Sequence, residues 1–186
     1  LSRSARTSSA LSTAARIGEG AWLLALPASY VAGLQVLVRS LVQGHEPAIL
    51  SGKFTAEAFA ATALGMTSSV GGTRVPSYTS LVPAQLGTLL DAAPHDPSVA
   101  DALRSFEAIL IGGQALPAAM AARADELGVK IVRTYGSSET AGGCIYDGVP
   151  LDGVRVREAD GELQLGGPTL ADGYLDAPDL TAQVFV

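Results

Sequence analysis

The sequence is poor in cysteine and histidine. It holds one cysteine, Cys144, and two histidines, His45 and His95. A single cysteine excludes an internal disulfide framework and is typical of a reducing compartment, so we expect a cytoplasmic protein. Because neither histidine is close to Cys144 in the sequence, we interpret this cysteine as a small buried hydrophobe and not as a nucleophile.

Long apolar runs and an excess of positive charge are also missing. No apolar stretch approaches the roughly 20 residues that a membrane-spanning helix needs. The formal net charge is −6, from 18 acidic and 12 basic residues, which argues against a general nucleic-acid binder. An anionic substrate would therefore need local sites made of backbone N–H groups and arginine.

What the sequence does contain is a series of alternating short and long apolar segments. Hydrophobic residues make up 48% of the 186 positions and charged residues 16%, as in one globular domain or a piece of a larger one. Short apolar runs predict buried strands at 22–26, 47–50, 75–80, 106–111 and 131–132. Helices are predicted at 8–17, 31–42, 55–66, 81–90, 98–104 and 117–127. Ser98 is predicted to cap the helix at 98–104. This order predicts an α/β fold, with a mainly parallel sheet and crossover helices.

The pattern changes after Gly148. Residues 153–157 and 162–165 alternate apolar and polar side chains around Asp160-Gly161, a hairpin turn signal. We therefore expect residues 1–148 to form the α/β portion and 149–186 to begin a small antiparallel β-subdomain.

A turn rich in hydroxyl groups follows the strand predicted at 131–132. It runs through Tyr135-Gly-Ser-Ser-Glu139-Thr140 to Gly142-Gly143. Small side chains let backbone N–H groups approach an anion, and a lone carboxylate suits a Mg²⁺ ion that bridges to substrate phosphates. The alternative is a Ser/Gly-rich turn with a helix-capping Ser and Glu. A nucleophile elbow is excluded, because Thr140 stands where a Gly-x-Ser-x-Gly motif beginning at Gly136 needs its second glycine.

Two further features carry weaker signals. Arg39 lies in the nearly wholly apolar segment 31–42, where it either contacts a substrate carboxylate or reaches solvent from the helix C-terminus. The pair Gly112-Gly113 follows a predicted strand and precedes a helix, which is a common turn between the two.

The turn motif resembles the Tyr-Gly-x-Thr-Glu motif of the adenylate-forming superfamily, which includes acyl- and aryl-CoA ligases, luciferases and peptide-synthetase adenylation domains. Ser138 replaces the usual threonine and keeps its hydroxyl. Four more segments resemble superfamily motifs in the same order. They are Leu26–Gly33, with Tyr30 in place of histidine, Thr79–Pro83, Gly112–Ala115 and Gly173–Thr181.

Within the superfamily, residues 30–39 and 78–86 are most similar to the o-succinylbenzoate–CoA ligases of menaquinone biosynthesis. The resemblance implies an ATP-dependent acid–CoA ligase that adenylates o-succinylbenzoate and then forms its CoA thioester, with ATP, Mg²⁺ and coenzyme A. It implies small-molecule partners and no nucleic acid or membrane, and it allows a homo-oligomer. The alternatives are another aryl- or acyl-CoA ligase, a non-catalytic nucleotide- or acyl-binding module, or an unrelated α/β domain.

The resemblance also assigns roles to residues. Glu139 would hold Mg²⁺, while Ser138 and Thr140 would bond phosphate oxygens. Arg39 would pair with the free carboxylate of the acid. The nucleotide would contact Gly112, Gly113, Gln114, Ala115, Tyr135, Gly136 and Ser137, and the acid would contact Tyr30, Arg39, Thr79 and Ser80.

The resemblance finally implies that the chain is the middle of a larger N-terminal domain. A phosphate loop is expected before Leu1, and a ribose-binding segment and a C-terminal domain with a catalytic lysine are expected after Val186. Taken alone, these 186 residues are expected to be inactive as a ligase.

Overall fold

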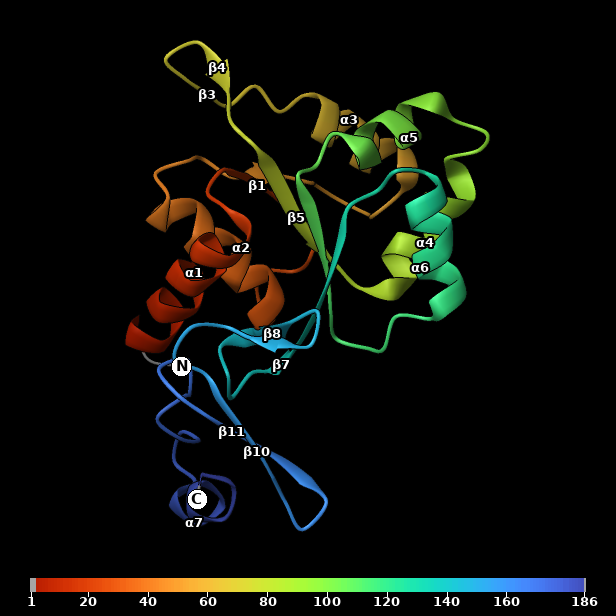
Figure 1. The fold of residues 1–186 in the computed structure, drawn as a ribbon. Coiled ribbons are helices and arrows are strands. Elements are labelled where there is room, and N and C mark those ends of the chain that lie inside the picture. The colour runs from red at the N-terminus through yellow and green to blue at the C-terminus, as the bar shows by residue number, and fades with distance from the viewer. Residues whose placement is uncertain (1–2, 186) are drawn as a thin grey trace.

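The computed structural model describes residues 3–185 and is built around one seven-stranded sheet (Figure 1). Its strands follow the order β2-β1-β5-β6-β7-β8-β9, and neighbouring strands from β2 to β7 are parallel. The strands are β1 (Ala21–Leu24), β2 (Ala48–Ile49), β5 (Ser77–Leu81), β6 (Ala108–Ile111), β7 (Ile131–Ser137), β8 (Gly142–Tyr146) and β9 (Val149–Pro150). The predicted α/β class is confirmed.

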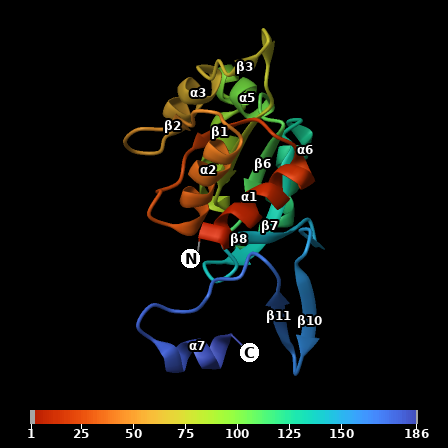
Figure 2. The ribbon, with the colours of Figure 1, turned by 90° about the vertical axis from the view of Figure 1, so that its left-hand side faces the viewer.

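Helices cover both faces of this sheet. On one face lie α1 (Arg3–Ile17) and α2 (Val31–Val42), which are in front of the strands in Figure 2. The helices of the other face are α3 (Ala56–Leu64), α4 (Pro83–Ala92), α5 (Pro97–Arg104) and α6 (Ala118–Glu126). The short apolar strands are therefore buried on both sides, which is why they read as nearly continuous hydrophobic runs.

Alternate residues of each strand face different cores. In β1, Leu23 packs with helices α3–α6, whereas Trp22 points to the α2 side with Val36 and Tyr78. In β6, Ile109 faces the first core and Leu110 faces the second. The period-two geometry of strands thus builds two hydrophobic cores from one sheet.

Most predicted boundaries lie within two residues of the observed ones, and the helix predicted at 31–42 is confirmed to the residue. The start predicted for the first helix was wrong, because α1 begins at Arg3 and not at Ser8. The prediction for Ser98 was wrong, because the side chain of Asp96 caps α5 by accepting from the backbone N–H of Ser98. A hydrogen bond from the Ser98 hydroxyl, followed by this backbone bond, holds the pKa of Asp96 below its usual value. Pro97 occupies the first helical position, so the cap falls at Asp96, two residues earlier than we expected.

The end of the sheet also differs from the prediction. Tyr135, Gly136 and Ser137 belong to β7, which continues well beyond the predicted strand 131–132. The strand extends because β8 folds back and pairs with it in antiparallel orientation, and β9 then pairs antiparallel with β8. A turn of only four residues, 138–141, joins β7 to β8.

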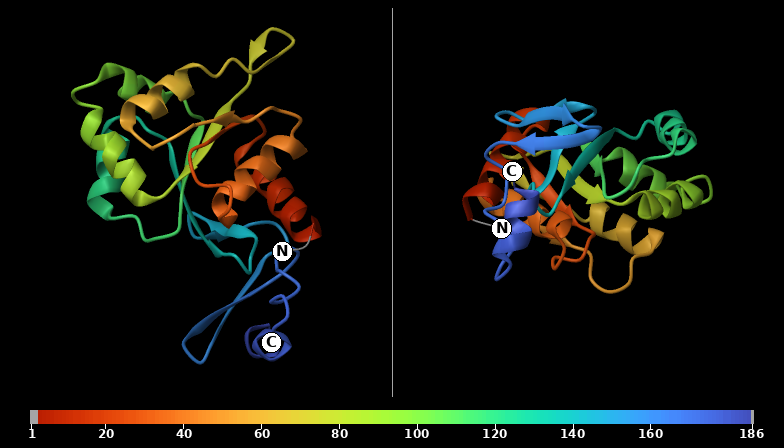
Figure 3. Two further views of the ribbon diagram at one scale, coloured as in Figure 1. Left: turned by 180° about the vertical axis from the view of Figure 1, so that it is seen from behind. Right: turned by 90° about the horizontal axis from the view of Figure 1, so that it is seen from below.

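A smaller unit projects from this end of the sheet (Figure 3). It contains the predicted hairpin, formed by β10 (Arg155–Ala159) and β11 (Glu162–Gly166), with Asp160 and Gly161 at positive φ in the turn. The helix α7 (Pro178–Val184) was not predicted, and neither was the small hairpin of β3 (Ser69–Val70) and β4 (Thr73–Arg74). Within residues 3–185, no helix is long and apolar enough to cross a membrane.

The packing of α3 gives a test of the larger core. Phe59 is fully buried, and its ring lies 5.7 Å from that of Phe106 and 6.0 Å from that of Phe54. We expect Phe59→Ala to lower the free energy of unfolding by about 3–5 kcal/mol, through lost burial and a residual cavity. On the same helix, the exposed Leu64 is the control, and Leu64→Ala should change stability by no more than about 0.5 kcal/mol. Chemical denaturation measures both, and equal losses would contradict this packing.

Candidate active site

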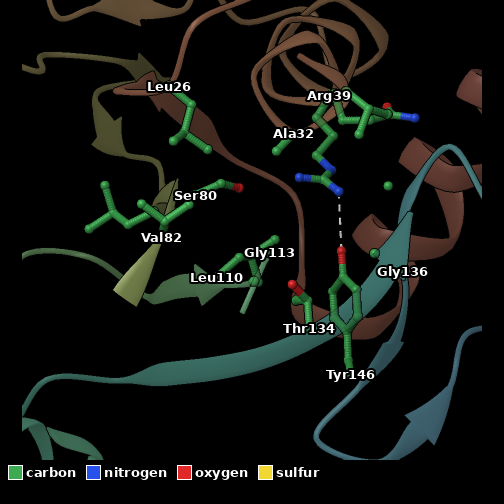
Figure 4. A pocket seen from close by; sticks show the side chains of 16 residues that line it. Leu26, Ala32, Arg39, Ser80, Val82, Leu110, Gly113, Thr134, Gly136 and Tyr146 are labelled. Carbon is green, nitrogen blue, oxygen red and sulfur yellow. Dashed lines mark hydrogen bonds between the residues drawn. The ribbon is translucent and has the colours of Figure 1, made fainter. Parts of the chain in front are cut away.

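The carboxyl ends of the parallel strands meet α2 at one edge of the sheet. Residues just after β1 (Leu26), at the end of β5 (Ser80), after β6 (Gly112) and within β7 (Thr134) line a common cavity there. Crossover connections leave this edge free of packed helix, so it is where open α/β sheets bind ligands. The cavity has a volume of about 120 Å³, and we call it the Arg39 cavity (Figure 4).

Arg39 of α2 points into this cavity and is only 3% exposed. Its Nη2 donates a hydrogen bond of 3.2 Å to the hydroxyl of Tyr146, and its guanidinium lies 4.9 Å from the ring centroid of Trp22. The Nε atom is buried without a hydrogen-bond partner, and within residues 3–185 no ion pair includes Arg39. The side chain therefore does not reach solvent, and the part of the chain that the structure describes supplies no counter-ion for its charge.

Tyr146 contacts Arg39, and the sequence did not indicate this contact. Its hydroxyl lies 2.9 Å from the Thr13 hydroxyl of α1 as well as within reach of Arg39. Thr13 in turn donates to the carbonyl of Ser9. In the sequence, Tyr146 ends an ordinary apolar run, and only the antiparallel return of β8 brings it under α2.

A second, larger space lies beside the Arg39 cavity. This space, the Tyr135 groove, has a volume of about 870 Å³, and Val156 and Leu163 of the projecting hairpin form one wall. It shares Gly113, Thr134 and Gly136 with the Arg39 cavity. Five of the residues predicted to contact nucleotide line it: Gly113, Gln114, Ala115, Tyr135 and Gly136. Gly112 lines only the Arg39 cavity, and Ser137 lines neither space.

Two of these glycines are required by close packing. A Cβ atom on Gly112 would lie 2.5 Å from Oγ1 of Thr134, and one on Gly136 would lie 2.0 Å from the carbonyl oxygen of Gly142. Any side chain at either position would push β6, β7 and β8 apart. The glycines of the motifs thus let the strands approach closely at the junction of the two spaces.

The turn between β7 and β8 is closed by Thr140. Its Oγ1 accepts a hydrogen bond from the N–H of Ser137 and lies 2.8 Å from the carbonyl oxygen of Gly142, to which it donates. The hydroxyl of Thr140 is therefore used inside the turn, whereas Ser137 and Ser138 are exposed. The alternative of a helix-capping Ser and Glu is wrong, because the turn leads into a strand and not into a helix.

Glu139 sits on this turn and is held from the projecting unit. The Tyr174 hydroxyl donates a hydrogen bond of 2.5 Å to Oε1 of Glu139, and the N–H of Ala171 donates to its carbonyl oxygen at 2.7 Å. The Tyr174 hydroxyl, followed by that of Ser137, holds the pKa of Glu139 below its ordinary value, and the same contact raises the pKa of Tyr174. The turn thus presents an ionised carboxylate at neutral pH.

Any metal ion bound by the described residues would have to rely on single side chains such as Glu139. Residues 3–185 contain no cluster of three or more His, Cys, Asp or Glu side chains that could hold a metal ion. One carboxylate suffices only for an ion such as Mg²⁺, which keeps several waters and takes other ligands from substrate phosphates. Cys144 is fully buried in β8, and burial raises the pKa of its thiol, as expected for a small hydrophobe.

The predicted acid-binding residues are separated by the structure. Ser80 lines the Arg39 cavity together with Arg39 itself. Thr79 is fully buried, does not line that cavity, and donates from its hydroxyl to the carbonyl of Leu23 in the adjacent strand. Tyr30 is 70% exposed at the start of α2 and does not line the cavity either.

Comparisons with known proteins agree with this geometry. A family model described as AMP-binding enzyme matches residues 2–175. A probable 2-succinylbenzoate–CoA ligase of Mycobacterium tuberculosis (strain ATCC 25618 / H37Rv) is 45% identical over 188 residues, which cover 98% of this chain and 47% of that protein. The chain therefore spans about half the length of this curated relative.

Solved structures of similar fold include two proteins named MenE. The wild-type Escherichia coli protein, with a bound phenylether-linked analogue of OSB-AMS, aligns with a TM-score of 0.72 at 27% identity, covering 92% of this chain and 36% of that one. The Bacillus subtilis o-succinylbenzoate coenzyme A synthetase in complex with AMP aligns with a TM-score of 0.81 at 21% identity, covering 98% and 50%. The second likeness is one of fold alone.

The placement of Thr79 generates a prediction that separates a structural role from substrate contact. Thr79→Val keeps the shape but leaves the Leu23 carbonyl without its donor, so stability should fall by about 1–3 kcal/mol. Acid binding should be unchanged, because the hydroxyl faces the sheet. Thermal unfolding and titration with the acid substrate measure the two effects. Weaker acid binding at unchanged stability would instead support the prediction that Thr79 contacts the acid.

Proposed function

The chain belongs to the AMP-binding enzyme family, and on this premise we propose that the intact protein is an ATP-dependent acid–CoA ligase. Its acid is proposed to be 2-succinylbenzoate, which carries two carboxylates. The name of the Mycobacterium tuberculosis relative and the analogue bound by Escherichia coli MenE support this choice of acid. Coenzyme A as co-substrate and a cytoplasmic location belong to the same proposal.

The observation that carries the proposal is the buried guanidinium of Arg39. It lies in a mainly apolar cavity and has a hydroxyl and an aromatic ring as neighbours, but no carboxylate among residues 3–185. A charge buried in this way is strongly stabilised by an anion that enters the cavity. The free carboxylate of a diacid provides that anion, and the planar guanidinium fork matches its geometry.

The Tyr135 groove is the proposed nucleotide site. Its wall at Gly113, Gln114 and Ala115 offers backbone groups, and the Tyr135 side chain is 55% exposed and available to stack on an adenine ring. The groove meets the Arg39 cavity at Thr134 and Gly136. An acid anchored by Arg39 would therefore extend its other carboxylate toward the nucleotide phosphates.

Glu139 is the proposed Mg²⁺ ligand. Its low pKa keeps it ionised, and Tyr174 engages Oε1 while the remaining lone pairs stay available for a cation. When bound, Mg²⁺ would neutralise charge on the nucleotide phosphates. Ser138 is exposed next to Glu139, so its hydroxyl is available to phosphate oxygens. The Ser137 hydroxyl bonds to Glu139, and the Thr140 hydroxyl serves to shape the turn.

These placements support a two-step reaction. A carboxylate oxygen of the acid attacks the α-phosphorus of ATP, the bond to the β-phosphate breaks, and pyrophosphate leaves. The sulfur of coenzyme A then attacks the acyl carbon, its proton is lost, and AMP leaves. For the first step the chain supplies orientation, since Arg39 holds one end of the acid and the groove holds the nucleotide.

The division of the chain stays a prediction within this proposal. We place the α/β portion at 1–148 and the start of the β-subdomain at 149–186. Strand β9 still pairs with β8 beyond this point, and the antiparallel hairpin follows it. Because Tyr174 and Ala171 contact Glu139, the second portion contributes to the proposed Mg²⁺ site.

The role of Glu139 can be tested in the intact protein. Glu139→Gln removes the charge at nearly constant shape, so acid-dependent pyrophosphate release should fall by a factor of about 10² or more while the fold is kept. Glu158→Gln, an exposed change on β10, is the matched control and should release pyrophosphate normally. If Glu139→Gln lowered the melting temperature but released pyrophosphate at the normal rate, Glu139 would be a structural residue.

The role of Arg39 is tested by comparing acids. Arg39→Ala should lower kcat/KM for the dicarboxylate, because the second carboxylate loses its partner. The loss should correspond to a rise of about 2–5 kcal/mol in activation free energy. Arg39→Lys should show a smaller loss, since it keeps the charge but not the planar fork. A monocarboxylate analogue should lose far less in both variants.

The control is Arg16→Ala, which removes an exposed arginine from the last turn of the neighbouring helix α1. It should leave both acids unaffected. Equal losses for the dicarboxylate and the monocarboxylate in Arg39→Ala would contradict the assignment of a dicarboxylate substrate.

A further inference from the structure

Helix α2 contacts the Glu139 turn through a second polar residue, Gln35. This residue lies one helical turn before Arg39, is fully buried, and also lines the Arg39 cavity. Its Nε2 donates a hydrogen bond of 2.7 Å to the carbonyl oxygen of Ala141. From α1, the Ser9 hydroxyl reaches the same oxygen at the longer distance of 3.4 Å. Gln35 is therefore the principal side-chain donor to the Ala141 carbonyl.

The part of the turn that Gln35 contacts is the part that needs external support. Ala141 is fully buried and has a φ of 54°, in the left-handed region that disfavours residues with a Cβ atom. It lies two positions after Glu139. The Cγ atom of Gln35 would also lie 3.5 Å from a Cβ atom on Gly142, so the side chain packs against the end of the turn.

The orientation of the Gln35 amide follows from its surroundings. With Oε1 turned toward the Ala141 carbonyl, two acceptors would face each other, so Nε2 must occupy that position. Oε1 then stays buried without a hydrogen-bond partner among the described residues. An apolar side chain of the same length would fill this space without that cost. The contribution of the amide is therefore its bond to the turn.

Helix α2 thus contacts both ends of β8. Gln35 binds Ala141 at the start of the strand, and Arg39 binds Tyr146 at its end. The residue proposed to hold the acid and the turn proposed to hold Mg²⁺ are fixed to the same helix, one turn apart. Any shift of the turn relative to α2 would change the distance between the acid and the phosphates.

We propose that Gln35 is a positioning residue that sets the place of the Glu139 turn relative to the acid held by Arg39. The inference rests on the proposed ligase function and deepens it. Gln35 acts through Ala141 and makes no bond to the reacting atoms. Its loss should therefore slow adenylation of bound acid and leave the binding of the acid nearly unchanged.

The test uses the intact protein with Gln35→Met, which keeps the length of the side chain and removes the donor. We expect kcat for acid-dependent pyrophosphate release to fall by about tenfold or more, because small misplacements of reacting groups are costly, while KM for the acid stays within about twofold. Gln43→Met is the matched control. Gln43 is the residue that follows the last turn of α2. Its Oε1 accepts hydrogen bonds from the backbone N–H of Gly20 and from Nε1 of Trp22, away from the turn. This variant should lose stability and keep kcat.

Hydrogen exchange of the backbone amides of residues 138–142 gives a readout that does not depend on turnover. Exchange should accelerate in Gln35→Met and stay at the wild-type rate in Gln43→Met. If the wild-type protein adenylates no acid, the proposed function fails, and the exchange rates still test the contact between Gln35 and the turn.

Three results would overturn the proposal: an unchanged kcat in Gln35→Met, a rise in KM for the acid as large as the fall in kcat, or unchanged exchange in the turn. If Gln35→Met does not fold, Gln35→Asn withdraws the amide from Ala141 by one methylene and keeps the side chain polar. The same expected and contrary results apply to that variant.

Discussion

The arrangement of the site depends on one buried guanidinium and on the strand that returns beneath it. Arg39 lies between Trp22 of strand β1 and Tyr146 of the antiparallel strand β8, with no carboxylate beside it among residues 3–185. A charge placed in this way costs free energy in the empty cavity and is favourable once an anion enters. The same contact fixes β8 under α2, so the proposed recognition of a carboxylate and the geometry of the Glu139 turn share one support.

The antiparallel end of the sheet gives the fold its functional character. A sheet that stayed parallel would have continued from β7 into another helix. Instead β7 turns within four residues into β8, and the close contacts at Gly112 and Gly136 allow the strands to meet at the junction of the two spaces. The turn then contacts three elements from different parts of the chain: α1 through Ser9, α2 through Gln35, and the projecting unit through Tyr174.

Much of the fold could be predicted from local patterns. Helix α2 and the β10–β11 hairpin follow from periodicity and turn residues, which act over a few positions. The extent of β7 could not be predicted in this way, because Tyr135 and Gly136 become strand only through pairing with β8. Gly113, Gln114, Ala115 and Tyr135, which the motifs assigned to the nucleotide, line one groove. The motifs also assigned Tyr30 and Thr79 to the acid, and these two residues do not line the Arg39 cavity.

The sequence by itself determined the α/β class and the family, and it singled out Glu139 and Arg39, on which the proposed function rests, because short motifs and an isolated charge in an apolar helix are local signals. Only the tertiary structure decided that Arg39 stays buried, that Thr140 closes the turn, and that Gln35, Tyr146 and Tyr174 contact the site. The physical reason is that each of these contacts joins residues far apart in the chain. Hydrogen bonds of this kind depend on how the strands and helices pack, and the local pattern of residues does not contain that information.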